Sequence, residues 1–240
     1  MRILALAACM VLAVTTAQAA FVDNFDGTAL DARWTPQTIG THSVAGGQLT
    51  AQMSNTLYAN PLAFNLITTA APVGDFTATM KCSVAGTAGY LPSVGIGLFS
   101  ADHQSLVMTA EEEDHFNWGE FPGKKYGIVT AEGTVSGTAF PFTLTRAMVG
   151  KSTANVPFYL QISRSGDIYT LSSSLDGTTF ATDWTGAYSG TSELTQLGRS
   201  FFGSNGTAQN GMVDSVVVTP EPATLGLLVL GGLAVIRRRR

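Results

Sequence analysis

Apolar and polar residues alternate one by one along much of this chain, and this period of two predicts β-strands. Residues 75–84 are a long example, in which every second position is apolar: Phe76, Ala78, Met80, Cys82 and Val84. The alternation returns in residues 156–164, 168–174 and 211–218. Between residues 20 and 219, no stretch of a dozen residues follows the helical period. We therefore predict an all-β body.

The spacing of strands and turn signals predicts two antiparallel sheets packed face to face. Ser165-Gly166-Asp167 separates two of the predicted strands, and Asp176-Gly177 is a strong hairpin signal. A body of about 200 residues suits one such domain. It contains no tandem repeat and no Pro- or Gly-rich linker. We expect a single β-sandwich domain over residues 20–218, with a signal helix before it and a hydrophobic helix after it.

The charge of the body argues against nucleic acid as a partner. Between the two chain ends, eight basic residues face sixteen acidic ones, which gives a formal net charge of −8. Phosphate binding requires a basic face. Cys82 is the single cysteine expected to remain after export, and its apolar neighbours predict a small buried side chain. The fold must then be held together by its core, without an intrachain disulfide.

The N-terminus has the three parts of a secretory signal peptide. Arg2 supplies the positive charge, residues 3–14 are apolar, and Ala17-Gln18-Ala19 forms a small-residue cleavage site. We expect residues 1–19 to be removed. An alternative is a lipoprotein signal, because Leu6-Ala7-Ala8-Cys9 matches a lipobox, although its apolar region would be shorter than usual. In both cases the body leaves the cytoplasm.

The C-terminal segment, residues 219–240, combines a Pro-rich motif, an apolar run and a basic end. Pro220, Glu221 and Pro222 form the motif, and Arg237 to Arg240 end the chain. The apolar run, the 14 residues 223–236, would span about 21 Å as a helix, short of the ~30 Å hydrocarbon core. The arginines would stay on the cytoplasmic side. We expect transient anchoring in the inner membrane, and a plain anchor helix is the alternative.

This combination resembles the PEP-CTERM sorting signal of Gram-negative bacteria. The resemblance implies that Pro220, Glu221 and Pro222 are recognised by an exosortase, a membrane enzyme similar to transpeptidases. The tail would then be cleaved, and the body would reach the cell surface or the extracellular matrix.

The opening of the body carries a second resemblance. Asn24-Phe25-Asp26-Gly27, followed by Leu30-Asp31 and Trp34, is similar to the first strand and turn of concanavalin A-like (laminin-G-like) jelly rolls. Residues 160–180 resemble the late hairpin of that fold, and residues 202–206 and 213–218 resemble its final strands. Lectins, glycoside hydrolases and structural modules share such folds, so the fold leaves the function open.

One dense acidic cluster, residues 111–120, is the candidate site for chemistry. Retaining glycosidases need two carboxylates about 5–5.5 Å apart. In the laminarinase-like family they follow a Glu-x-Asp-x-(x)-Glu pattern on one strand, which would make Glu112 the nucleophile and Asp114 the middle carboxylate. The acid/base position then holds Phe116 or Asn117, neither of which can donate the proton. We therefore expect no enzyme, with a jelly-roll glycoside hydrolase as the alternative.

A binding role would use the same cluster differently. Trp118 could stack on a sugar ring while Asp114, Asn117 or Glu120 accept hydrogen bonds from its hydroxyls. No cofactor is predicted, although adjacent carboxylates could hold Ca²⁺. The plainer alternative is that Phe116 and Trp118 are core and the acids form a solvated turn. We expect an exported, noncatalytic protein that binds extracellular polysaccharide or has a structural role.

Overall fold

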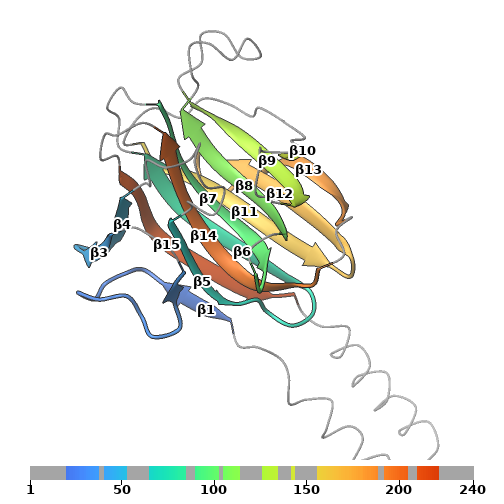
Figure 1. Cartoon of the computed structure of the whole chain (residues 1–240), viewed down its shortest axis with the longest axis horizontal. Coiled ribbons are helices and arrows are strands. Elements are labelled where there is room, and N and C mark those ends of the chain that lie inside the picture. The colour runs from blue at the N-terminus through green and yellow to red at the C-terminus, as the bar shows by residue number, and fades with distance from the viewer. Residues whose placement is uncertain are drawn as a thin grey trace, which may run out of the picture.

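The described part of the chain is an all-β body, seen here in a computed structural model (Figure 1). The structure describes residues 20–37, 41–52, 65–84, 90–102, 105–113, 126–134, 142–143, 156–188, 192–204 and 210–221. Within these ranges every regular element is a strand, and all strand pairs are antiparallel. The predicted fold class is confirmed for this body. The predicted signal helix and C-terminal helix lie outside the described residues.

Among the described residues, the first sheet contains eight strands. Their order is β13 (Ala181–Ala187), β12 (Ile168–Ser174), β11 (Phe158–Ser165), β6 (Phe76–Val84), β15 (Asn210–Pro220), β4 (Gln48–Gln52) and β3 (His42–Ala45), with β1 (Phe21–Asp23) paired to β15.

The second sheet contains seven strands within the same described ranges. Their order is β10 (Phe142–Thr143), β9 (Tyr126–Thr134), β8 (Ser105–Glu113), β7 (Tyr90–Ser100), β14 (Leu194–Ser204), β5 (Asn65–Ala70) and β2 (Thr35–Pro36). Figure 1 shows the sheets as stacked layers, with β7 and β8 in front of β11 and β12. After β6 the chain passes to the second sheet for β7 to β10 and returns to the first for β11 to β13, and β14 lies again in the second sheet before β15 in the first.

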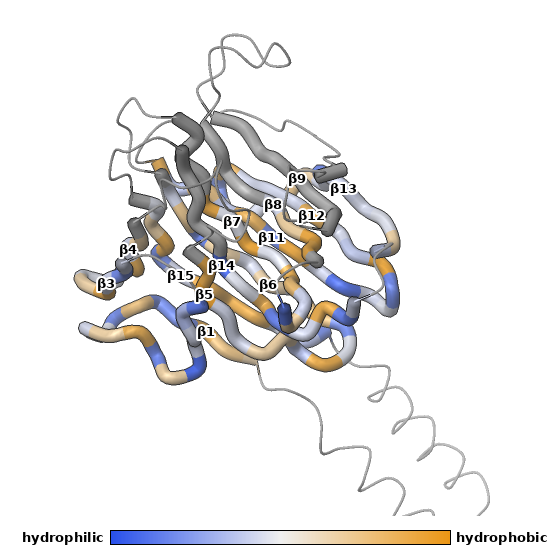
Figure 2. Tube along the Cα trace, in the orientation of Figure 1, coloured by the Kyte–Doolittle hydropathy of each residue, from blue (hydrophilic) through white to orange (hydrophobic). Residues whose placement is uncertain are grey.

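The predicted alternation gives the first sheet its buried face. Along β6 the buried side chains are Phe76, Ala78, Met80 and Cys82, while Thr77, Thr79 and Lys81 on the other face are partly exposed. Strand β11 repeats the pattern, and Figure 2 shows hydrophobic residues (orange) interleaved with paler polar ones along this sheet. The prediction that Cys82 is a buried core residue is confirmed.

A β-bulge interrupts the alternation in β15. Val213 pairs with Cys82 and Ser215 with Lys81, so that Asp214 is the extra residue. The insertion shifts the buried positions from Val213 to Val216 and Val218. The Asp214 carboxylate accepts a hydrogen bond from Gln48 and forms an ion pair with Lys81, at 2.8 and 3.0 Å. The bulge therefore turns a carboxylate away from the core.

The second sheet has buried side chains on both faces. Val94, Ile96 and Leu98 belong to the core between the sheets, whereas Phe99 and Met108 are buried outside that core cluster. Gly97 allows β7 and β8 to approach closely, because a Cβ atom there would lie 2.5 Å from the Cβ of Met108. Glycine at this position therefore serves close packing of the two strands.

The predicted signal peptide, residues 1–19, lies outside the described residues, and so do residues 222–240 of the predicted sorting segment 219–240. In the part of the chain that the structure describes, no helix has the length and apolarity needed to cross a membrane.

Candidate functional site

The acidic cluster singled out in the sequence is only partly described. Glu112 occupies β8, where it pairs with Ser93 on one side and Gly127 on the other, and the strand ends at Glu113. Asp114, Asn117, Trp118 and Glu120 lie outside the described residues. Within the described ranges, no group of three or more His, Cys, Asp or Glu residues could hold a metal ion. The sugar and calcium hypotheses for this cluster remain predictions.

The predicted sorting motif begins inside the folded body. Strand β15 continues to Pro220, which pairs with Phe76 on β6, two residues beyond the expected end of the domain. The backbone N–H of Glu221 donates a hydrogen bond to the carbonyl oxygen of Asp75, with an N···O distance of 3.0 Å. The Thr77 hydroxyl donates to Oε1 of Glu221 at 2.7 Å. Two of the three motif residues are thus held by the sheet, and Pro222 lies outside the described residues.

A groove of about 480 Å³ lies beside the junction between the folded body and the sorting motif, and Asp75 belongs to both. Its walls come from the turn between β5 and β6, the turn between β11 and β12, and the residues between β13 and β14. The side chains that line it are Asp75, Arg164, Asp167, Tyr169, Tyr188, Ser192, Glu193 and Leu194.

Hydrogen bonds between two turns fix one wall of the groove. The Arg164 guanidinium donates to the carbonyl oxygens of Pro72 and Gly74, and it stacks over the Phe76 ring at 5.1 Å. In return, the Asp75 carboxylate accepts a hydrogen bond from the backbone N–H of Gly166 at 2.8 Å. Gly166 has φ = +58°, a conformation that glycine adopts without steric cost. The wall is therefore organised before any ligand binds.

The rest of the groove lining combines aromatic rings with exposed carboxylates. Tyr169 and Tyr188 meet edge to face, with ring centroids 6.4 Å apart. Tyr169 is only 8% exposed, and the Tyr188 hydroxyl is buried without a hydrogen-bond partner among the described residues. Asp167 and Glu193 are exposed. Carboxylates that accept hydrogen bonds beside an apolar ring suit a ligand with many hydroxyl groups.

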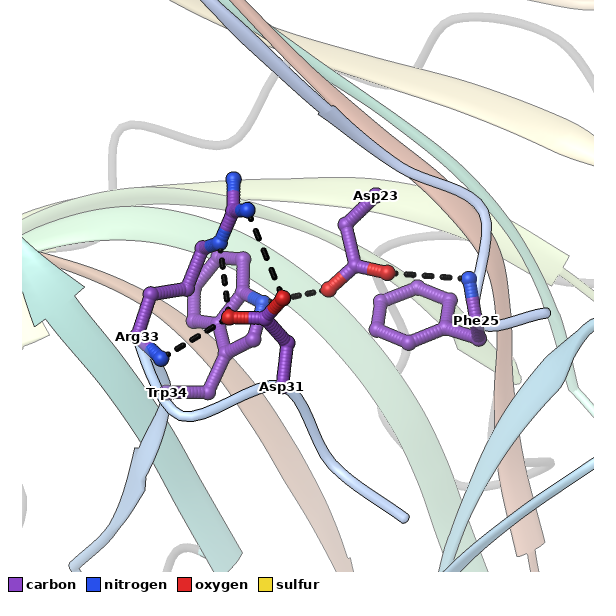
Figure 3. A network of polar contacts seen from close by, with 5 residues as sticks. All are labelled: Asp23, Phe25, Asp31, Arg33 and Trp34. Carbon is purple, nitrogen blue, oxygen red and sulfur yellow. Dashed lines mark hydrogen bonds and ion pairs between the residues drawn. The ribbon is translucent and has the colours of Figure 1, made fainter. Parts of the chain in front are cut away.

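A second polar network fixes the opening segment of the body (Figure 3). The Asp23 carboxylate accepts hydrogen bonds from the Trp34 indole N–H at 2.6 Å and from the Phe25 backbone N–H at 2.9 Å. Phe25 has φ = 55°, which is uncommon for a residue other than glycine. Asp31 binds Arg33 through an ion pair of 2.9 Å. These contacts hold the segment that carries the jelly-roll resemblance.

Arg199 of β14 reaches this network from the second sheet. Its guanidinium carbon lies 3.8 Å from the ring centroid of Trp34 and 4.8 Å from that of Phe25. The residue is 0% exposed, and none of its three side-chain nitrogens has a hydrogen-bond partner within the described part of the chain. Burial lowers the pKa of Arg199 to about 9, while the nearby Asp23 carboxylate opposes that change. The site is closed to solvent, so we interpret it as structural.

Comparison with known families decides the interpretation of the C-terminus. Residues 218–240 match the PEP-CTERM protein-sorting motif. The chain carries a PEP-CTERM sorting motif. The predicted motif residues Pro220, Glu221 and Pro222 fall within the match. The motif implies an exported protein that is sorted to the cell surface and processed by an exosortase. No curated protein matches the chain in sequence.

Solved structures share the fold of the body at low sequence identity. A GH43 glycoside hydrolase with an engineered active site aligns with a TM-score of 0.65 and 16% identity, covering 86% of this chain and 42% of that one. A xylan β-1,4-xylosidase from Bacillus halodurans C-125 aligns with a TM-score of 0.63 and 13% identity over 84% and 39% of the two chains. The chain therefore spans about two fifths of the length of these enzymes.

A smaller solved structure aligns with this chain over nearly the whole length of that smaller protein. The CBM2 module of the evolved Dit protein of Lactobacillus casei BL23 phage J-1 aligns with a TM-score of 0.54 and 11% identity, covering 82% of this chain and 93% of that one. These likenesses show the fold, a β-sandwich consistent with the expected concanavalin A-like body.

Sequence reasoning did not find the groove or the docked motif. Asp75, Arg164 and Glu193 are far apart in the sequence and meet only because the turns between strands converge. The one local signal was Ser165-Gly166-Asp167, which was correctly predicted to be a turn.

Proposed function

We propose that this protein is an exported, noncatalytic cell-surface or matrix protein that binds extracellular polysaccharide and is released by exosortase cleavage at its tail. The observation that carries the proposal is the PEP-CTERM motif at residues 218–240, joined directly to a folded β-sandwich. In this account the apolar tail anchors the chain in the inner membrane for a limited time, until the motif is cleaved.

The groove beside the junction is the proposed contact for polysaccharide. The exposed carboxylates of Asp167 and Glu193 would accept hydrogen bonds from sugar hydroxyls, and the Tyr169 edge would pack against sugar C–H groups. The Arg164 wall is fixed by backbone carbonyls, so little ordering is needed on binding. A CBM2 module shares this fold, and the chain matches it over 93% of that module's length, so the fold is compatible with a binding role.

The proposal is tested with the mature protein recovered from the cell surface or the culture medium. We expect it to bind at least one neutral polysaccharide on a glycan array, and to release no new reducing ends from that polysaccharide. The substitutions Asp167→Asn and Glu193→Gln should each weaken binding about 5–10-fold, since each removes a charged acceptor. Asp26→Asn is the matched control, because Asp26 is exposed and lies outside the groove.

Two results would contradict the proposal. The absence of binding to any polysaccharide would leave a structural role as the function of the body. New reducing ends, lost on substitution of Glu112, would instead identify a glycoside hydrolase.

A further inference from the structure

We infer that the folded body docks the first part of its own sorting motif, and that this docking limits the rate at which the motif is recognised and cleaved. The inference rests on the proposed processing of the tail. It concerns a different property, namely the equilibrium between a docked and a released motif. Two partners create the docked state: the carbonyl oxygen of Asp75 and the hydroxyl of Thr77.

The docked state uses both the backbone and the side chain of Glu221. Its N–H is bonded to Asp75, and its carboxylate accepts the Thr77 hydroxyl at 2.7 Å. Pro220 is paired with Phe76, so the motif begins as the last residue of a strand in the first sheet. An enzyme that reads this glutamate must replace the Thr77 contact. It must also reach the backbone N–H of Glu221, which in the docked state is hydrogen-bonded to the carbonyl oxygen of Asp75.

The partners of Glu221 are themselves held in place. Thr77 belongs to β6, whose neighbours Phe76 and Ala78 are fully buried. Asp75 is tied through its carboxylate to the backbone N–H of Gly166 on the adjacent hairpin. The docking site is therefore part of the rigid sheet, and release of the motif requires the end of β15 to separate from β6.

The expected size of the effect follows from one hydrogen bond. The rate of recognition is proportional to the fraction of molecules in which the motif is released, so docking lowers that rate. Loss of a single solvent-accessible hydrogen bond increases that fraction about 3–10-fold, since such bonds contribute modestly. Because Glu221 is exposed, release of the motif requires only local separation of the end of β15 from β6, without unfolding of the core.

The test compares variants of the full-length chain in cells that contain an exosortase. Pulse-chase labelling measures the conversion from the long to the short form. Thr77→Val removes the hydroxyl and keeps the β-branched shape, and it should speed conversion about 3–10-fold. Thr77→Ser keeps the hydroxyl and should restore the wild-type rate. Thr170→Val is the matched control, because Thr170 is a partly exposed threonine of the same sheet whose hydroxyl bonds Thr185.

A second measurement does not depend on the enzyme. In the purified full-length chain in detergent, amide hydrogen exchange of Glu221 should be slowed in the wild type. Exchange should accelerate about 3–10-fold in Thr77→Val. An unprotected Glu221 amide in the wild type would overturn the inference, as would equal conversion rates for wild type and Thr77→Val.

The two proposals fail in different ways. If the wild-type tail is never cleaved, the proposed processing is wrong, and hydrogen exchange alone then decides whether the motif is docked. If the tail is cleaved at the same rate in wild type and in Thr77→Val, the proposed processing stands and the docking inference is wrong.

Discussion

Replacing Arg199 by methionine is expected to make the protein more stable, although it removes a side chain that is 0% exposed. The guanidinium carries up to five N–H donors, and its three nitrogens have no hydrogen-bond partner among the described residues. Unpaired buried donors each cost about 1–3 kcal/mol, and a buried charge costs more. Methionine has a similar length and leaves no polar atom to satisfy.

The aromatic rings reduce this cost without removing it. The rings of Trp34 and Phe25, at 3.8 and 4.8 Å, offer cation–π attraction of about 2 kcal/mol each when desolvated. Attraction to the Asp23 carboxylate adds to this. Replacement of buried charges by apolar residues of similar volume is commonly neutral or stabilising by about 1–4 kcal/mol. We expect Arg199→Met to raise the free energy of unfolding by about 1–3 kcal/mol.

Urea unfolding monitored by tryptophan fluorescence gives this quantity, and thermal unfolding should show a melting temperature higher by about 3–10 °C. Arg199→Lys is the companion variant. It keeps the charge but loses the planar group that stacks on both rings, so it should be less stable than the wild type. A loss of more than about 1 kcal/mol in Arg199→Met would refute the reasoning and show that the buried guanidinium is a net stabilising group.

Three further predictions concern the stability of the fold. Gly97→Ala should destabilise it by about 2–4 kcal/mol in urea unfolding, because the new Cβ would lie 2.5 Å from the Met108 Cβ; an unchanged midpoint would contradict the close approach of β7 and β8. Burial raises the pKa of Asp183 to about 6, so the unfolded chain ionises first, and stability should fall as the pH rises from about 4 to about 6. Asp183→Asn should remove that slope and add about 1 kcal/mol at pH 7, after allowance for solvent screening; an identical pH profile would refute the assignment. Backbone hydrogen bonds hold the pKa of Asp176 well below its usual value, so Asp176→Ala should speed amide exchange of Thr178 and Thr179 at neutral pH. In the wild type this protection should persist at pH 4 and weaken only in stronger acid, and its loss near pH 4 would contradict the lowered pKa.

The strands could be predicted from the sequence because their alternation is a local property. The prediction for residues 75–84 corresponds to β6 at Phe76–Val84, and that for residues 168–174 coincides with β12. The bulge at Asp214 could not be predicted, since an extra residue leaves no signature until the partner strand is known. The jelly-roll resemblance anticipated the sandwich correctly, while the order of strands in each sheet depends on contacts between distant segments.

The sites were harder to predict, because they too depend on contacts between segments that are distant in the sequence. The sorting motif consists of consecutive residues, so Pro220-Glu221-Pro222 could be recognised in the sequence. Its docking is not local, because Thr77 lies 144 residues before Glu221. The burial of Arg199 also runs against expectation, since arginine is rarely buried without a partner.

The central claim is that the tail serves sorting and is removed at the cell envelope. Intact-mass spectrometry of the protein recovered from the cell surface or medium tests this most directly. We expect a chain that begins at or near Ala20 and lacks Arg237 to Arg240, its C-terminus lying close to the Pro-Glu-Pro motif. A surface or secreted protein that keeps all four terminal arginines would contradict the account.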